Sequence, residues 1–438
     1  MDALDGGVQS CVEEIAGQLI DPGAVTGAAD GSDAASGPER DELRKVWDPA
    51  SLAVGYPGIS LLFSELSYQD ESYRSVAHRY LELSLDAIDP RGTQGLYSGL
   101  TAVAFALRAA QRTPRDYQAA LAGIEKLIEA YAGQVLAAEG RRLAERASAT
   151  TFAAYDSVSG LTGIGRYFLL DPVNRLDVLR RILTYLVGLT EPVWIGRREL
   201  PGWWVGHPAA MEEAPGGAGH VNFGMAHGAA GVLALLSLSW ASGTRVPGQE
   251  AAMSRIADWF LKTATRDEFG VRWPSSLKLS EYLDDSYRPL QRRPSWCYGS
   301  PGIARSLQLA GMALGEVRWL DCSRDALLAA LRRLDVQQDI RETGICHGWA
   351  GLLHTVHVMN RTLDLAPLDT CRRQIARTIL DSRSEDARFS FRVRHSGDAQ
   401  NLDVPGFLDG AAGTALALMS SICGDPPKSG WDRALLLS

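Results

Sequence analysis

Two cysteines and one histidine stand where they could form a catalytic metal site. Cys297 occurs in Ser-Trp-Cys-Tyr-Gly, and Cys346 and His347 occur in Ile-Cys-His-Gly-Trp. Each motif lies one or two positions before a Gly-x-x-Gly segment that opens an apolar stretch. Two thiolates and one imidazole leave one position of a tetrahedral zinc ion open, which is the pattern of catalytic rather than structural zinc. The sequence therefore predicts a zinc site made of these three residues.

A second group of residues has the chemistry of proton transfer. His227 lies in Asn-Phe-Gly-Met-Ala-His-Gly, and an imidazole both donates and accepts protons at neutral pH. Asp156, in Tyr-Asp-Ser-Val-Ser-Gly, would orient that imidazole, or would instead cap a helix N-terminus. Arg293 lies four residues before Cys297 and would hold a developing oxyanion, although its Arg-Arg-Pro context equally fits a solvated loop.

The remaining histidines and cysteines carry weaker signals. His354 and His357 follow the Cys-His motif on one helix, which favours packing or support of the site over direct metal binding. The spacing of His207 and His220 does not mark either of them as a functional residue. The other cysteines fall in helical stretches, where a thiol usually behaves as a small buried apolar group; they are Cys11, Cys322, Cys371 and Cys423.

A small-residue motif recurs seven times and defines the organisation of the chain. It occurs at Gly55–Gly58, Gly99–Ala102, Gly160–Gly163, Gly228–Gly231, Gly299–Gly302, Gly348–Gly351 and Gly410–Gly413. An apolar run follows each copy, which is typical of a helix buried on most sides. We interpret the glycines as sites of close helix packing.

An amphipathic stretch precedes each copy of the motif. One example places leucines at helical spacing with charged residues between them: Leu176, Leu179, Leu183 and Leu186. Helices that alternate between amphipathic and apolar can bury their apolar faces only against neighbouring repeats. We therefore expect an all-α protein, an α/α toroid of seven outer–inner helical hairpins, forming a single domain over residues 1–438.

The inner helices of such a toroid run parallel, so that their N-termini meet at one end. The predicted site residues Asp156, His227, Cys297, Cys346 and His347 all lie within four residues before an inner-helix glycine. We expect the free N–H groups of the helix N-termini to favour an anionic sulfur or oxygen there. Three long connections, which we predict to be loops or a small inserted subdomain, open on the same face: 190–226, 266–296 and 383–409.

The amino-acid composition and net charge exclude some classes of function. The chain has 438 residues, 46% of them hydrophobic and 22% charged, and a formal net charge of −8. This acidic balance argues against nucleic acid as a partner. No secretory signal pattern or apolar run long enough to span a bilayer is seen, and six scattered cysteines suit a reducing compartment. We therefore expect a cytoplasmic protein, with a mobile loop over residues 22–38.

Four motifs in order resemble those of the lanthipeptide cyclase (LanC-like) family. They are Tyr155-Asp-Ser-Val-Ser-Gly-Leu-Thr-Gly, Gly224-Met-Ala-His-Gly-Ala-Ala-Gly, Trp296-Cys-Tyr-Gly-Ser-Pro-Gly and Cys346-His-Gly-Trp-Ala-Gly. With the flanking repeats they cover nearly the whole chain from about residue 50, and the length resembles the free-standing class I lanthionine synthetase C type. The resemblance implies an α/α toroid with Zn²⁺ held by Cys297, Cys346 and His347. It also implies catalytic roles for three residues, namely Asp156, His227 and Arg293.

The function implied by the resemblance is thioether ring formation. A zinc-bound peptide cysteine would add to a dehydroalanine or dehydrobutyrine of the same precursor peptide, giving lanthionine or methyllanthionine. The implied partners are a dehydrated precursor peptide with its leader, and the dehydratase and transporter of the pathway. Peripheral attachment to a membrane through such a complex stays open. Family members also carry a small additional domain, which no motif places here.

Four other functions remain open at this point. One is a LanC-like enzyme that adds glutathione or another small thiol to dehydrated residues. The second is a zinc-stabilised scaffold that binds peptides without catalysis. The third is a zinc-dependent protein prenyltransferase, which would require an aspartate ligand and a partner subunit. The fourth is an α/α-ring glycosidase, for which Asp156 and Asp409 make a poor carboxylate pair.

Overall fold

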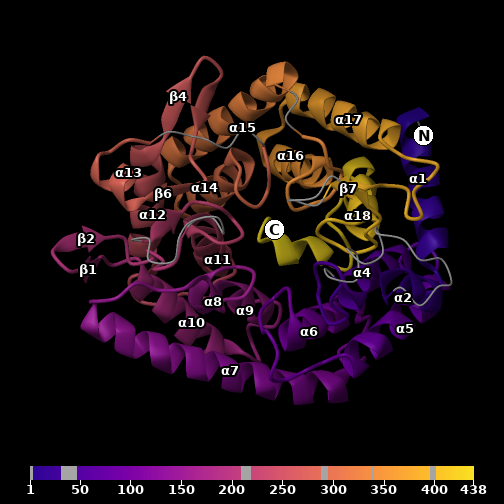
Figure 1. Cartoon of the computed structure of the whole chain (residues 1–438), viewed down its shortest axis with the longest axis horizontal. Coiled ribbons are helices and arrows are strands. Elements are labelled where there is room, and N and C mark those ends of the chain that lie inside the picture. Colours follow the sequence, from indigo (N-terminus) through magenta and orange to yellow (C-terminus); the bar gives the residue numbers. More distant parts are fainter. Residues whose placement is uncertain (1–2, 31–46, 209–218, 288–293, 338–339, 395–400) are drawn as a thin grey trace. The chain divides into compact units, whose positions relative to one another are not determined.

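The computed structural model describes residues 3–30, 47–208, 219–287, 294–337, 340–394 and 401–438 (Figure 1). They fall into two units. Unit 1 comprises Met1–Thr93, Tyr97–Glu125 and Ile340–Asp432, and unit 2 comprises Gln94–Leu96, Lys126–Asp339 and Arg433–Ser438. A single domain over the whole chain stays a prediction.

Seven inner helices begin at the recurring small-residue motif. In unit 1 these are α4 (Tyr56–Leu66), α6 (Gly99–Ala110), α16 (Trp349–Leu363) and α18 (Ala411–Ile422), and in unit 2 they are α9 (Leu161–Phe168), α11 (Ala229–Ala241) and α14 (Ser300–Leu314). They are buried on nearly every side: in α18, every residue from Ala411 to Ser421 is buried. The all-apolar runs therefore form the core helices that the sequence predicts.

In six of the seven motifs the last residue is a second glycine, and at the two closest contacts it is required by the turn before its own helix. A Cβ at Gly351 would lie 1.9 Å from the carbonyl oxygen of Ile345, and one at Gly413 would lie 1.7 Å from the carbonyl oxygen of Phe407. In both cases the obstructing carbonyl belongs to the residue six positions earlier. At these two positions the glycine therefore reflects a turn that folds back onto its helix, rather than the close approach of two helices.

In the same turns, N–H groups at the helix N-termini are already hydrogen-bonded to backbone carbonyls. In α16 the N–H groups of Trp349, Ala350 and Gly351 donate to carbonyls seven residues earlier, at 2.9, 2.9 and 3.4 Å. The first three N–H groups of α18 do the same toward residues 404–406. Our expectation that free N–H groups at these ends attract an anion is therefore wrong for α16 and α18.

Successive turns are joined by backbone hydrogen bonds within each unit. In unit 2, Ser157 donates to the carbonyl of Ala226 at 3.0 Å, and Ala226 donates to that of Cys297 at 3.2 Å. In unit 1, Cys346 donates to the carbonyl of Leu408 at 2.9 Å, and Leu408 to that of Ala53 at 2.9 Å. Turns that are distant in sequence thus lie side by side, which positions the residues they carry.

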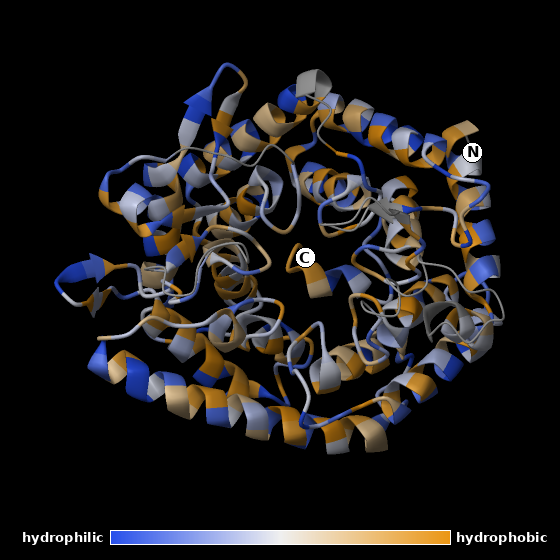
Figure 2. Cartoon of the chain, viewed as in Figure 1, coloured by the Kyte–Doolittle hydropathy of each residue, from blue (hydrophilic) through white to orange (hydrophobic). Residues whose placement is uncertain are grey.

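An amphipathic helix covers the inner helices of each repeat. The outer helices are α1 (Ala3–Leu19), α5 (Tyr73–Asp86), α7 (Gln118–Glu145), α10 (Leu176–Leu189), α12 (Gln249–Thr263), α15 (Val317–Gln337) and α17 (Ala366–Asp381). Helix α5 packs on α4, α15 on α14 and α17 on α16 (Figure 1). Figure 2 shows hydrophobic and hydrophilic residues alternating along α7 and α17. The all-α class and the outer–inner alternation are confirmed.

The three long connections contain short antiparallel strand pairs. β1 (Val193–Ile195) pairs with β2 (Arg198–Leu200), β4 (Thr265–Asp267) with β5 (Gly270–Arg272), and β7 (Val393–Arg394) with β8 (Asn401–Leu402). β3 (His220–Asn222) pairs with β6 (Ser276–Lys278), with Val221 opposite Leu277. This last pair joins the connections 190–226 and 266–296 inside unit 2. A short helix, α13 (Leu279–Leu283), follows β6.

The predicted mobile loop at 22–38 is wrong in its first part. Residues Pro22–Asp30 form helix α2. The Asp21 side chain accepts a hydrogen bond from the Gly23 N–H at 2.9 Å, and a proline at the start of a helix loses no hydrogen bond. Residues 31–38 lie outside the described residues. Among the helices that are described, none combines the length and apolar character that crossing a membrane requires.

Candidate active site

Asp156 and His227 form a pair in unit 2. His227 Nδ1 contacts Asp156 Oδ2, the Asp156 side chain is fully buried, and 26% of the His227 side chain is exposed. Asp156 follows the short helix α8 (Phe152–Tyr155), and His227 lies two residues before α11. The structure therefore brings together the two residues that the sequence selects for proton transfer.

The other oxygen of Asp156 holds the turn that leads into α9. Asp156 Oδ1 accepts hydrogen bonds from the N–H groups of Val158, Ser159 and Gly160, at 3.0, 2.7 and 2.9 Å. Asp156 thus contacts His227, as one interpretation has it, whereas the interpretation as a helix N-cap is wrong: Gly160 is the N-cap of α9, and Asp156 holds the turn before it. Since a carboxylate only accepts, Nδ1 of His227 carries the hydrogen and Nε2 is left for another group.

Aromatic rings fix the plane of the His227 imidazole. The Phe152 ring stacks on it with centroids 5.0 Å apart and an interplanar angle of 29°, and the Tyr298 ring lies at 5.8 Å. The Tyr155 hydroxyl donates to the His227 carbonyl oxygen at 2.8 Å. Burial, reinforced by the Asp156 charge, raises the pKa of Tyr155 well above its ordinary value, so this hydroxyl remains a donor.

Two histidines that no sequence pattern marked as functional contact the Phe152 ring, which stacks on His227. His207 and His220 meet the Phe152 ring edge-on, with centroids 4.6 and 5.6 Å away. His220 is buried, its Nδ1 lies 3.0 Å from the His207 carbonyl oxygen, and its backbone exchanges hydrogen bonds with Val205. Neither their spacing nor a motif marks these two histidines in the sequence. The one feature that could have indicated them is their place in a long connection between helices.

Cys297 occupies the turn next to that of His227. Its side chain is buried, and Sγ lies 3.7 Å from the Ser295 hydroxyl. The hydrogen bond from the Ala226 N–H to the Cys297 carbonyl joins the two turns. Arg293, the third residue predicted to be catalytic, lies outside the described residues.

Cys346 and His347 lie in unit 1, in the turn before α16. The Cys346 N–H donates to the Leu408 carbonyl at 2.9 Å. His347 Nε2 lies 2.6 Å from Glu342 Oε2, and His347 Nδ1 lies 3.9 Å from Asp409 Oδ1. The sequence analysis missed Glu342. Its only mark in the sequence is that it is acidic and lies four positions before Cys346.

His354 and His357 are buried within α16. His354 Nε2 lies 3.4 Å from Asp432 Oδ2. Burial lowers the pKa of His357 to about 4, with a further contribution from His354. These surroundings fit the packing role that we predict for both histidines.

The cysteines outside the three motifs differ in exposure. Cys11 is buried in α1, and burial raises the pKa of its thiol to about 11. Cys322 and Cys371 are partly buried, whereas Cys423 is exposed because it follows the last residue of α18. The prediction of a buried thiol is therefore wrong for Cys423.

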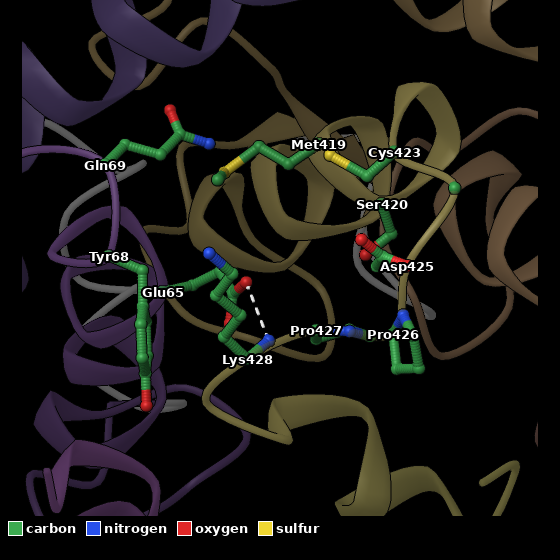
Figure 3. Close-up of a pocket in the computed structure, with 11 residues that line it drawn as sticks. Glu65, Tyr68, Gln69, Met419, Ser420, Cys423, Asp425, Pro426, Pro427 and Lys428 are labelled. Atoms are coloured by element: carbon green, nitrogen blue, oxygen red, sulfur yellow. Dashed lines mark hydrogen bonds between the residues drawn. The ribbon is translucent and has the colours of Figure 1, made fainter.

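A cavity of about 300 Å³ lies at the C-terminal ends of α4 and α18 in unit 1 (Figure 3). Tyr68, Met419 and Cys423 are among the residues that line it. Both oxygens of Glu65 are occupied there, because they accept hydrogen bonds from the N–H groups of Lys428 and Ser429, at 3.0 and 2.8 Å. The cavity lies at the opposite end of α18 from the turn that contacts Cys346, so it is separate from the predicted site.

Comparison with known proteins identifies the family. The family model described as "Lanthionine synthetase C-like protein" matches residues 46–436. The nisin biosynthesis protein NisC of Lactococcus lactis subsp. lactis is 26% identical over 378 residues, which cover 84% of each chain. The solved structure of nisin cyclase matches with a TM-score of 0.73 and 25% identity, covering 91% of this chain and 94% of that one. This likeness confirms the α/α toroid as the fold class. Because the family model spans most of its length, the chain belongs to the lanthionine synthetase C-like family of lanthipeptide cyclases.

Proposed function

We propose that this protein is a zinc-dependent lanthionine synthetase that forms thioether rings in a dehydrated precursor peptide. Membership of the family and the likeness to nisin cyclase support the cyclase class. The Asp156–His227 pair carries the proposal, because it supplies a proton-transfer group within the matching family motifs.

The reaction joins a thiol and a carbon–carbon double bond of the same peptide. The cysteine thiol loses its proton, and its sulfur bonds to the β-carbon of a dehydroalanine or dehydrobutyrine. The electron pair of the double bond moves toward the α-carbon and the adjoining amide oxygen. One proton then adds at the α-carbon, so the process is an addition without any oxidant or reductant.

His227 is the group that we propose for the proton at the α-carbon. Its Nδ1 is engaged by Asp156, so Nε2 is the nitrogen that carries and releases the proton. The buried Asp156 carboxylate fixes this tautomer and stabilises the protonated ring, as the aspartate does in other histidine-based catalytic groups. The partial exposure of His227 leaves the ring open to a peptide.

The residues proposed as metal ligands have the chemistry that zinc requires. Cys297, Cys346 and His347 offer two thiols and one imidazole, the donors that we propose for the metal ion. Three protein ligands leave the fourth position of a tetrahedral ion for a substrate. Bound there, zinc would keep the peptide cysteine deprotonated at neutral pH.

The remaining roles rest on the family motifs. We propose that Arg293 neutralises the charge that develops on the amide oxygen. We also propose a cytoplasmic protein whose partners are the precursor peptide with its leader, and the dehydratase and transporter of the same pathway.

The test uses a peptide that carries one dehydroalanine and one cysteine. Cyclisation leaves the mass unchanged and makes the thiol unreactive toward N-ethylmaleimide. We expect wild-type protein to cyclise this peptide, and His227→Ala to be slower by about 10²- to 10⁴-fold while retaining zinc. Wild-type activity in His227→Ala would remove this residue from the mechanism.

The same assay with added glutathione separates the alternatives. A mass gain of one glutathione, without ring formation, would favour the addition of a small thiol. Zinc-loaded wild-type protein that binds the peptide without reaction would favour a scaffold.

A further inference from the structure

Glu342 and His347 form a carboxylate–imidazole contact in the turn before α16. Glu342 Oε2 lies 2.6 Å from His347 Nε2, which is a hydrogen-bond distance. Only 7% of the Glu342 side chain is exposed, compared with 33% of the His347 side chain. A carboxylate this deeply buried is normally retained only when it is paired.

The backbone holds Glu342 in place. Its carbonyl oxygen accepts a hydrogen bond from the Trp349 N–H at 2.9 Å, so residues 342–349 form one closed turn onto α16. The neighbouring Thr343 and Gly344 carbonyls accept from the next two N–H groups of the helix. The Glu342 side chain therefore starts from a backbone position that the turn holds.

This contact selects the ring nitrogen that can bind a metal. The carboxylate only accepts, so Nε2 of His347 must carry the hydrogen and Nδ1 keeps its lone pair. Asp409 Oδ1 is 3.9 Å from Nδ1, which is beyond hydrogen-bond distance, so this carboxylate contact is weaker than that of Glu342. Nδ1 is also the ring nitrogen closer to the His347 backbone.

We infer that Glu342 is a positioning residue for the metal ligand His347. It fixes the imidazole in the Nε2–H form and in one orientation, so that Nδ1 is the nitrogen that would hold the metal. This inference rests on the proposed zinc function and adds to it a residue that contacts the ligand but not the metal. Carboxylates in this role strengthen metal binding by about 10- to 100-fold.

The test measures zinc affinity by competition with a chromophoric chelator, in the full-length protein. We expect Glu342→Ala to weaken zinc binding by about 10- to 100-fold. Glu342→Gln should weaken it less, because its amide oxygen still accepts the Nε2 hydrogen. Asp409→Asn is the matched control and should bind zinc like the wild type.

Three outcomes would overturn the inference: zinc affinity in Glu342→Ala equal to that of the wild type, a loss in Asp409→Asn as large as in Glu342→Ala, or an Nδ1–H form of His347 in the metal-free wild type. The last is read from ¹⁵N chemical shifts of the ring and needs neither a variant nor activity. A wild-type protein that binds no zinc would instead contradict the proposed function. The two failures are therefore distinguishable.

Discussion

Each unit contains a histidine paired with a carboxylate, and the two pairs use opposite nitrogens of the ring. In unit 2, Asp156 contacts Nδ1 of His227, whereas in unit 1, Glu342 contacts Nε2 of His347. The free nitrogen of His227 is thus the one at the tip of the side chain. In His347 the nitrogen that does not face Glu342 is Nδ1, the one nearer the backbone.

The difference shows how one side-chain type can serve two kinds of chemistry. A nitrogen at the tip of the ring can reach a bound peptide and exchange a proton with it. A nitrogen close to the backbone is held more rigidly, which suits a metal ligand. The carboxylate decides between the two uses, because its position determines which nitrogen carries the hydrogen.

The largest expected effect follows from removing a ligand on the metal side of this comparison. Cys346→Ala should lose zinc and cyclisation together, because two ligands rarely retain the metal that three would hold. Metal content by mass spectrometry and the thiol-alkylation assay measure both. Cys371→Ala, a partly buried cysteine in α17, is the control and should keep both. Full zinc retention in Cys346→Ala would contradict the ligand assignment.

The next largest effect is expected from changing Asp156, the carboxylate that contacts His227. Asp156→Asn should slow cyclisation by about 10²-fold or more, because its amide cannot stabilise a protonated His227. Zinc content should not change. This variant should fold normally, since its amide oxygen can still accept the three turn N–H groups. Activity near that of the wild type would show that His227 acts without its partner.

Asp156→Ala separates the turn-holding role of Asp156 from its proposed catalytic role. It leaves the N–H groups of Val158, Ser159 and Gly160 without their acceptor. We expect a loss of about 1–3 kcal/mol in the free energy of unfolding, beyond that of Asp156→Asn. Chemical denaturation of both variants measures the difference, and equal stability would argue against the turn-holding role.

His357 shows the effect of burial on a histidine whose Nε2 has no hydrogen-bond partner among the described residues. Its pKa is lowered from 6.5 to about 4, mainly by burial and also by His354, Arg372 and Arg361, while Asp432 acts in the opposite direction. Because the folded-state pKa lies below the unfolded one, the stability contributed by neutral His357 is present above pH 6.5. It is lost as the pH falls from 6.5 toward 4.

This loss should amount to at most about 3 kcal/mol, at 1.36 kcal/mol per unit of pKa. Denaturation at a series of pH values should show a shallower acid slope in His357→Gln than in the wild type. Identical slopes would mean that another group controls acid stability.

The smallest effect concerns the aromatic support of His227. Phe152→Leu removes the stacked ring, and stacking of about 0.5–1.5 kcal/mol corresponds to a roughly 2- to 10-fold loss of rate. A shifted pH–rate profile would distinguish loss of His227 positioning from a general structural defect. Phe152→Tyr should restore both rate and profile. An unchanged rate and pH–rate profile in Phe152→Leu would show that Phe152 does not help to position His227.

Much of the fold was predictable because its signals are local. The leucines of α10 mark an outer helix by their spacing alone, and the runs after Gly228 and Gly410 mark inner helices by their composition. Helix α2 was missed because its cap depends on the single residue Asp21 in an Ala- and Gly-rich stretch. The strand pair β3–β6 was missed because its strands have three residues each and lie far apart in the sequence.

The sequence by itself determined the residue types available for chemistry and the helical repeat that carries them. Asp156, His227, Cys297, Cys346 and His347 could be selected because each stands in a short motif before an inner helix. Only the tertiary structure decided their partners, such as Asp156 for His227, Glu342 for His347, and His207 and His220 for Phe152. Motifs are local, whereas a hydrogen bond depends on side-chain positions that most of these pairs acquire only when turns distant in sequence come together.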